Sequence, residues 1–171
     1  MYEWIQGRPT VVLRDADVPR WPGGEIATTR LPRFAAVGQF AGSSVLVLRD
    51  PELTTAVPLE LGGMLLVSAV YAEDDASLGA HLEMLPVTGW EMLPERFVAH
   101  GGTYALFDGS LRGRDLEDPA RRDEILEQHG GVIRFALEAG AYEVECLGPW
   151  DPDEQTSLWL TRLVRAAPNG G

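Results

Sequence analysis

The sequence contains no lysine and one cysteine, Cys146, in 171 residues, and all 14 of its basic residues are arginine. Without lysine, neither a Schiff base on the chain nor a lysine nucleophile can form, so that covalent chemistry is excluded. A single cysteine excludes an intramolecular disulfide framework. Its place within a strand pattern favours an inert, buried thiol over a nucleophile. No stretch approaches the roughly 18 apolar residues that a membrane-spanning helix requires.

Several motifs that carry chemistry are also missing from the sequence. There is no GxSxG elbow, no GxxxxGK phosphate loop, and no GxGxxG after an expected strand, which argues against hydrolase and nucleotide-binding functions. His81, His100 and His129 lack the short spacings that place two imidazoles on one metal ion. Asp151 and Asp153 begin like a calcium loop, but Pro152 interrupts it. The residues alone therefore identify no catalytic residue, and we expect no metal and no cofactor.

The charge balance is strongly acidic, with a formal net charge of −12 and an isoelectric point near 4.6. Such a surface repels nucleic acid and anionic lipid, because binding to either needs basic residues that neutralise phosphates. A basic protein partner would be attracted, although an acidic surface also serves solubility alone. The first residues lack a basic leader followed by a long apolar stretch, so we expect a cytoplasmic protein.

The segment from Gly130 to Ala166 carries the clearest strand pattern. In its first part, Ile133, Phe135 and Leu137 alternate with polar residues, and a second apolar series follows Gly140. The prolines and carboxylates of GPWDPDE, residues 148–154, predict a turn before the last apolar run. We expect three antiparallel strands in a meander, with this turn between the second strand and the third.

The segment from Gly62 to Leu85 predicts a buried strand that leads into an amphipathic helix. Met64 to Ala72 is apolar, as in a central strand covered on both faces. Asp74 or Asp75 can cap a helix whose apolar stripe is Leu78, Leu82 and Leu85. A second, short surface helix is expected from Pro119 to Gln128, with Asp118 as its cap and Gly130 as its stop.

Further short strands are expected where apolar runs are bounded by glycine and proline, at residues 2–5, 10–13, 34–40, 45–49, 89–93, 96–100 and 103–108. Gly42 and the pair Gly101 and Gly102 predict the turns of two hairpins. Together these elements indicate an α+β fold, mainly an antiparallel sheet with the amphipathic helix packed on one face. We predict a single domain over residues 1–167 and a frayed tail at 168–171.

Acidic residues gather in three clusters, which lie in expected loops or at expected helix starts. The clusters are Glu73, Asp74 and Asp75; Asp115, Glu117, Asp118, Asp123 and Glu124; and Asp151, Asp153 and Glu154. Such residues serve as helix caps and for solubility, and a docking surface for a basic partner is the alternative. The candidate partner-binding residues combine two of these clusters with two loop tryptophans, and they are Trp150, Asp151, Asp153, Glu154, Trp21, Asp74 and Asp75. For each tryptophan, the alternative is that its ring packs in the core instead of binding a partner.

A series of short motifs runs along nearly the whole chain, and they are WIQGRPTVVL from Trp4, Trp21, VLRDPELTTA from Val47, GGMLLVSAVYA from Gly62, GWE from Gly89, YALFDGS from Tyr104 and FALEAGAYEV from Phe135. In this order they resemble the Immunity protein 21 family of bacterial polymorphic toxin systems. Residues Ala27 to Arg30 depart from the aspartate, tyrosine and arginine cluster of that family. The resemblance implies a cytoplasmic, non-enzymatic α+β protein that binds and blocks a co-encoded toxin domain.

Three hypotheses follow for the function. The first is an immunity protein whose acidic surface docks on a basic toxin domain. The second is a small enzyme or ligand-binding domain that uses a pocket between helix and sheet. The third is a structural homodimer built by sheet pairing through the last strand. The sequence does not identify the toxin or the oligomeric state.

Overall fold

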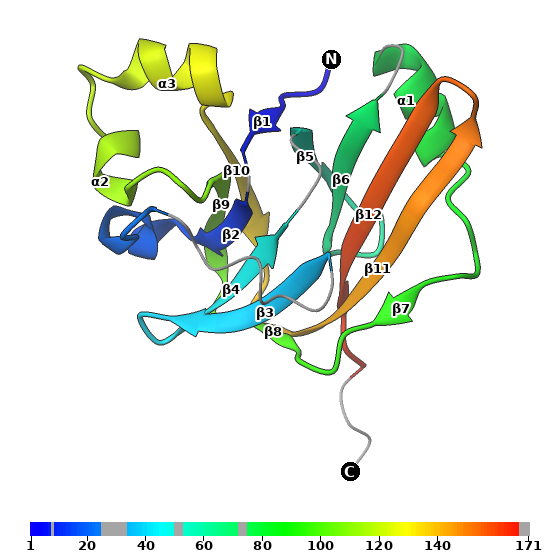
Figure 1. The fold of residues 1–171 in the computed structure, drawn as a ribbon. Coiled ribbons are helices and arrows are strands. Elements are labelled where there is room, and N and C mark those ends of the chain that lie inside the picture. The colour runs from blue at the N-terminus through cyan, green and yellow to red at the C-terminus, as the bar shows by residue number, and fades with distance from the viewer. Residues whose placement is uncertain (8, 25–33, 50–52, 72–74, 168–171) are drawn as a thin grey trace.

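The computed structural model describes residues 1–7, 9–24, 34–49, 53–71 and 75–167. Two antiparallel sheets face each other, and short helices lie at their outer sides and ends (Figure 1). The mainly antiparallel α+β fold class is therefore confirmed. The part of the chain that the structure describes contains no helix long and apolar enough to cross a membrane.

The first sheet, sheet A, has the strand order β1, β5, β6, β12, β11, β7, and β8 also pairs with β11. Its strands are β1 (Ile5–Gln6), β5 (Leu53–Pro58), β6 (Met64–Tyr71), β7 (Glu91–Met92), β8 (Phe97–Ala99), β11 (Gly140–Asp153) and β12 (Thr156–Arg165). Every residue of β6 from Met64 to Ala69 is buried, which confirms the expected central strand. Strand β5 was not predicted from the sequence, and it pairs with β6 from Met64 to Ala69.

The second sheet, sheet B, has the strand order β10, β9, β2, β4, β3. Its strands are β2 (Thr10–Arg14), β3 (Ala35–Phe40), β4 (Ser43–Leu48), β9 (Gly102–Asp108) and β10 (Val132–Leu137). The predicted hairpin around Gly42 is confirmed, because β3 and β4 pair from Phe40 and Ser43 outward. Ala41 and Gly42 both have positive φ angles, 54° and 86°, as a tight two-residue hairpin turn requires.

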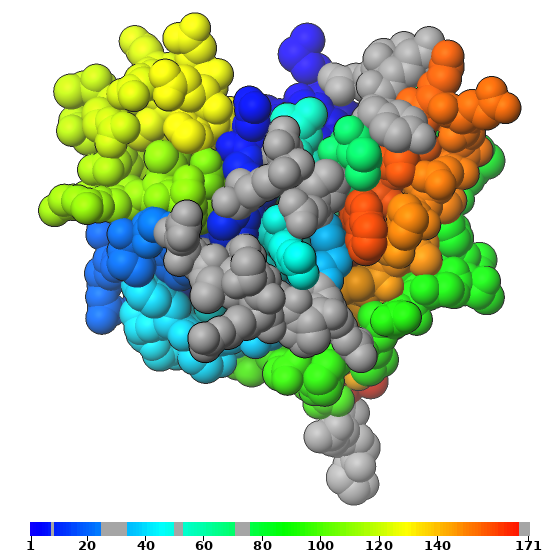
Figure 2. All heavy atoms as spheres, in the orientation of Figure 1, coloured from blue at the N-terminus to red at the C-terminus, as the bar shows by residue number. Residues whose placement is uncertain are grey.

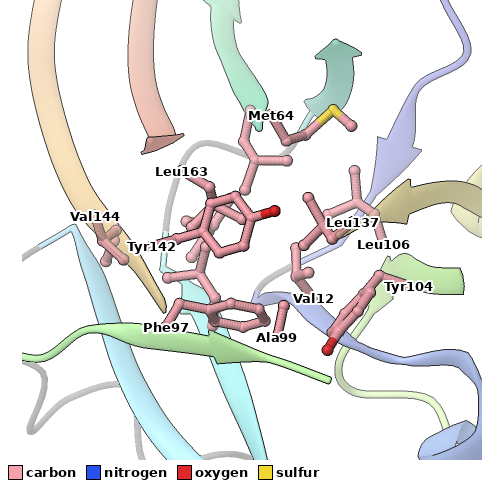
Figure 3. Packing of buried hydrophobic residues seen from close by; sticks show 14 of the residues in the cluster. Val12, Met64, Phe97, Ala99, Tyr104, Leu106, Leu137, Tyr142, Val144 and Leu163 are labelled. Atoms are coloured by element: carbon pink, nitrogen blue, oxygen red, sulfur yellow. The ribbon is translucent and has the colours of Figure 1, made fainter. Parts of the chain in front are cut away.

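The main core lies between the two sheets. Tyr142 and Leu163 from sheet A point toward Val12 and Leu106 from sheet B (Figure 3). Alternate residues of the central strands of sheet B face the other way, where Trp21 joins a second buried cluster with Val11, Val47, Phe107 and others. Because these strands bury both faces, they read as nearly continuous apolar runs.

Helical segments lie near the outer faces and ends of the sheets, and they are η1 (Asp15–Arg20), α1 (Asp75–Leu82), α2 (Gly113–Leu116) and α3 (Arg122–His129). Leu78 of α1 belongs to a third buried cluster on the outer face of sheet A, together with Leu65, Leu158 and Leu160. Gly130 ends α3 with a left-handed φ of 74°, as expected. Asp118 does not cap that helix. It accepts a hydrogen bond from the Ala120 amide, and α3 begins later, at Arg122.

The predicted three-stranded meander is wrong in its first strand. Strand β10 pairs with β9 at the edge of sheet B, whereas β11 and β12 pair in sheet A. The chain therefore crosses between sheets after Leu137. The expected hairpin at Gly101 and Gly102 is wrong for the same reason, because β8 lies in sheet A and β9 in sheet B. Alternation along a strand defines its buried face but not its neighbour, so these partners were not encoded in the pattern.

The last strand is also not a free edge. Strand β12 pairs with β6 on one side and with β11 on the other, so it is a central strand of sheet A. A homodimer formed by pairing through this strand would have to break one of these two ladders. The dimer hypothesis in that form is therefore wrong.

Candidate partner-binding site

The hairpin end of β11 and β12 carries four of the predicted partner-binding residues, Trp150, Asp151, Asp153 and Glu154. The expected turn over residues 148–154 is wrong, because Gly148 to Asp153 continue strand β11 and the connection lies at Glu154 and Gln155. The pairing of β11 with β12 is interrupted between Leu147 and Trp150 and again between Trp150 and Asp153. These irregularities accommodate two prolines that a regular ladder would exclude.

Trp150 connects this hairpin to the body of the protein. Its position is directly across from Leu158 in the register of the two strands. The side chain is half-buried and packs against the buried cluster on the outer face of sheet A. Trp150 is therefore partly an architectural residue, and it gives the hairpin end a fixed position relative to the sheet.

Asp153 forms two hydrogen-bonded contacts at the hairpin end. Its Oδ1 accepts a hydrogen bond of 2.8 Å from the Gln155 amide, and its Oδ2 lies 2.8 Å from His81 Nε2. The hydrogen bond from the Gln155 amide is the largest cause that holds the pKa of the Asp153 carboxyl below its usual range, and the His81 ring is a smaller one. The His81 contact links α1 to the hairpin. No local pattern indicates this pair, because it joins two segments far apart in the chain.

The other two carboxylates of the hairpin end face solvent. Asp151 and Glu154 are both exposed. Within the described ranges, neither residue has an ion-pair partner. We name Trp150, Asp151, Asp153 and Glu154 the hairpin tip. In the sequence, Asp151 and Glu154 lie on either side of Asp153, the carboxylate that contacts His81.

Trp21 does not lie near the hairpin tip. It is 7% exposed and belongs to the cluster on the outer side of sheet B. Its indole Nε1 donates a hydrogen bond of 2.9 Å to the Gly109 carbonyl oxygen, and its ring meets Phe40 and Phe107 edge to face. The core role that the sequence left open is the one observed. A buried indole with its N–H satisfied presents no surface for a partner.

The remaining predicted positions lie at the start of α1. Asp75 is the first residue of that helix, but its side chain is not described. Asp74 lies outside the described residues. Their role in partner binding stays a prediction.

The acidic cluster of residues 115–124 lies on another part of the molecule. Figure 2 shows the helical segment that carries it (yellow-green) at the upper left of the visible face and the hairpin of β11 and β12 (orange) at the upper right. Arg121 bridges two of its carboxylates, at 2.9 Å from Asp115 and 3.4 Å from Glu124. These charges are partly neutralised within the cluster, so the hairpin tip is the better candidate for a basic partner.

A groove of about 850 Å³ lies between α1 and the outer face of sheet A. It is the kind of pocket that the ligand-binding hypothesis requires. Its lining combines aliphatic side chains with a few charged ones, and the residues are Tyr2, Val57, Pro58, Leu59, Glu60, Leu61, Gly62, Leu65, Gly79, Leu82, Glu83, Leu85, Glu145, Arg162 and Val164. We name it the α1 groove.

Arg162 lies on the sheet side of the α1 groove and is engaged twice. Its Nε donates to the Glu145 carboxylate, and its guanidinium carbon lies 4.0 Å from the centroid of the Trp90 ring. Trp90 Nε1 donates to the Pro86 carbonyl oxygen at 2.7 Å. No local sequence pattern predicts this arrangement, because the pairing of Glu145 with Arg162 depends on the register of β11 and β12.

The histidines do not converge. His129 Nδ1 lies 2.8 Å from Asp108 Oδ2 at the end of sheet B, and His81 contacts the hairpin tip. Among the described residues, no cluster of three or more histidine, cysteine and acidic side chains could hold a metal ion. Cys146 is half-buried rather than buried, with its sulfur 3.7 Å from Thr161 Oγ1.

Comparisons with known proteins identify no relative of this chain. No protein-family model matches the chain, and neither a curated protein nor a solved structure matches it.

Proposed function

We propose that this protein is a non-enzymatic, cytoplasmic binding protein of the immunity type, which neutralises a basic toxin domain encoded next to it. The hairpin tip is the surface that first meets the partner. The observation that carries this proposal is the pair of exposed carboxylates, Asp151 and Glu154, which form no ion pair with any described residue and lie on a hairpin end held by two contacts to the body.

The physical argument is pre-organisation. Trp150 anchors the hairpin end on the sheet, and the His81 contact to Asp153 fixes it against α1. A rigid array of carboxylates loses little conformational entropy when a partner binds. Opposite charges accelerate association, and the net charge of −12 adds a long-range attraction to any basic domain.

The test is co-expression with the product of the neighbouring gene. We expect a complex that survives purification and an association rate that falls as salt concentration rises. The double variant Asp151→Asn and Glu154→Gln removes two negative charges from the hairpin tip and should lower the association rate. The control is the double variant Glu124→Gln and Glu127→Gln, which removes the same amount of charge from α3. Equal effects of the two pairs would exclude the hairpin tip. A chain that binds no neighbouring product and protects against none contradicts the proposed function.

A second candidate function is ligand binding, which the α1 groove favours. A mostly aliphatic lining with a few polar groups is typical of sites for small molecules. The test is a thermal-shift screen of small apolar compounds, in which a true ligand raises Tm for the wild type and not for Leu82→Arg. Compounds that shift both proteins equally would count against this candidate.

A further inference from the structure

The α1 groove exposes apolar side chains between α1 and the outer face of sheet A. Leu61, in the turn between β5 and β6, is 97% exposed at the rim. Leu82 and Leu85 from the helix side, and Val57 and Val164 from the sheet side, are half-buried. Accessible apolar side chains that line a groove and are bordered by polar residues are typical of an interaction site.

The charges of the groove are predominantly negative. Glu60 lies on the β5–β6 turn and Glu83 directly follows α1, and both side chains are exposed. In the described part of the chain, neither forms an ion pair. Glu145 is the third carboxylate, and the single guanidinium, Arg162, is already held by Glu145 and by the Trp90 ring. An anionic ligand in the groove would therefore face two carboxylates without an ion-pair partner, and none of the described lining residues offers it an available cation.

We propose that the α1 groove binds a basic amphipathic segment of a protein partner, with aliphatic side chains in the groove and arginine or lysine side chains at Glu60 and Glu83. A helix that places apolar residues on one face and cations beside them matches both properties of the groove. An anionic membrane is repelled by the same carboxylates. A second copy of this chain, with a net charge of −12, is repelled likewise.

The position of the groove connects it to the hairpin tip. His81 contacts Asp153 of the tip, and the next residues of the chain, Leu82 and Glu83, line the groove. One partner that reaches across this end of α1 contacts both surfaces. This inference rests on the proposed function, because it takes the partner to be basic. It adds which part of that partner supplies the apolar anchor.

The experiment uses the full chain and a synthetic helical peptide with leucines along one face and lysines beside them. We expect the peptide to bind with an affinity that falls at least about tenfold for Leu61→Ser and for Glu83→Arg. The matched controls are Leu126→Ser and Glu127→Arg on α3, where Leu126 is 61% exposed. These changes should leave the affinity unchanged. All four positions are exposed, so each variant is expected to fold, which circular dichroism checks.

Four outcomes overturn the inference. They are no binding of the peptide, equal losses in the controls, equal binding of a peptide with glutamate in place of lysine, and a self-association of the chain that Leu61→Ser abolishes. The two proposals fail separately. If the neighbouring gene product binds and depends on Asp151 and Glu154 but not on Leu61 and Glu83, the proposed function stands and the groove inference fails. If the wild type binds no neighbouring product, the proposed function fails and the peptide alone decides the groove.

Discussion

The hydroxyl of Tyr142 donates a hydrogen bond of 3.0 Å to the backbone carbonyl oxygen of Glu138, where the chain passes from sheet B to sheet A. Another crossing between the sheets, from β8 to β9, has a counterpart, since the His100 amide donates to the Tyr104 hydroxyl at 3.0 Å. The two crossings are neighbours, because a Cβ atom added at Gly101 would lie 3.4 Å from the Ala139 amide nitrogen. Both tyrosine rings belong to the core between the sheets.

Replacing Tyr142 with phenylalanine should lower the free energy of unfolding by about 1 kcal/mol, because the ring packing is kept and one hydrogen bond is lost. Tyr104→Phe is the matched variant at the other crossing, and a similar loss is expected there. Urea denaturation measures both. A Tyr142→Phe protein as stable as the wild type would show that the hydroxyl contact contributes nothing.

Stability should also depend on pH through Tyr142. Burial raises the pKa of this phenol above its ordinary value of 10.0, and the Glu138 carboxylate adds to the shift while Arg165 opposes it. The folded state thus holds the proton more tightly than the unfolded state. The stability that results is complete below pH 10 and is lost as pH rises through the raised pKa. The difference in unfolding free energy between wild type and Tyr142→Phe should shrink in that range. A difference that stays constant up to pH 11 contradicts this expectation.

Gly113, at the start of α2, is predicted to tolerate no side chain. A Cβ atom there would lie 1.5 Å from the Val18 carbonyl oxygen, and the Gly113 amide donates to the Trp21 carbonyl at 2.9 Å. Gly113→Ala must separate α2 from η1, so we expect a loss of more than about 2 kcal/mol in unfolding free energy. Gly38→Ala is the control, since its Cβ would be 3.6 Å from Val45. Equal stabilities of the two variants would count against the clash.

The two tryptophans should behave differently when truncated. Trp21→Ala removes a buried ring and its hydrogen bond, and should lower the unfolding free energy by about 3–5 kcal/mol. Trp150→Ala removes a half-buried ring, and should cost less, about 1–3 kcal/mol. Under the proposed function, Trp150→Ala also weakens partner binding per folded molecule, whereas Trp21→Ala does not. Chemical denaturation and binding assays on the folded fraction separate the two effects, and the reverse order would contradict the assignment.

Much of the fold could be predicted from local patterns. The buried run of β6, the hairpin of β3 and β4, and the stop of α3 at Gly130 follow from apolar periodicity and from glycine at left-handed positions. The partner of β10 could not be predicted, because the same alternation fits either sheet. The prolines and carboxylates of residues 148–154 predict a turn, whereas register shifts in β11 place Pro149 and Pro152 in the strand.

The candidate site was predictable in its composition and not in its contacts. The acidic character of the hairpin tip is visible in the sequence at Asp151, Asp153 and Glu154. Its contact with His81, and the pairing of Arg162 with Glu145, depend on how distant segments meet. Burial of Trp21 is likewise a tertiary result, since the loop that carries it folds over the outer side of sheet B.

The central place of β12 has a consequence for how the protein is made. During synthesis, the ribosome delivers β6 long before β12, and Met64 pairs with Leu163 only when this last strand has emerged. Until then, β6 presents an apolar strand with one edge unsatisfied, which is a template for aggregation. Ordering of sheet A must therefore follow release of β12 from the exit tunnel, and nascent chains stalled before Thr156 should depend most on chaperones.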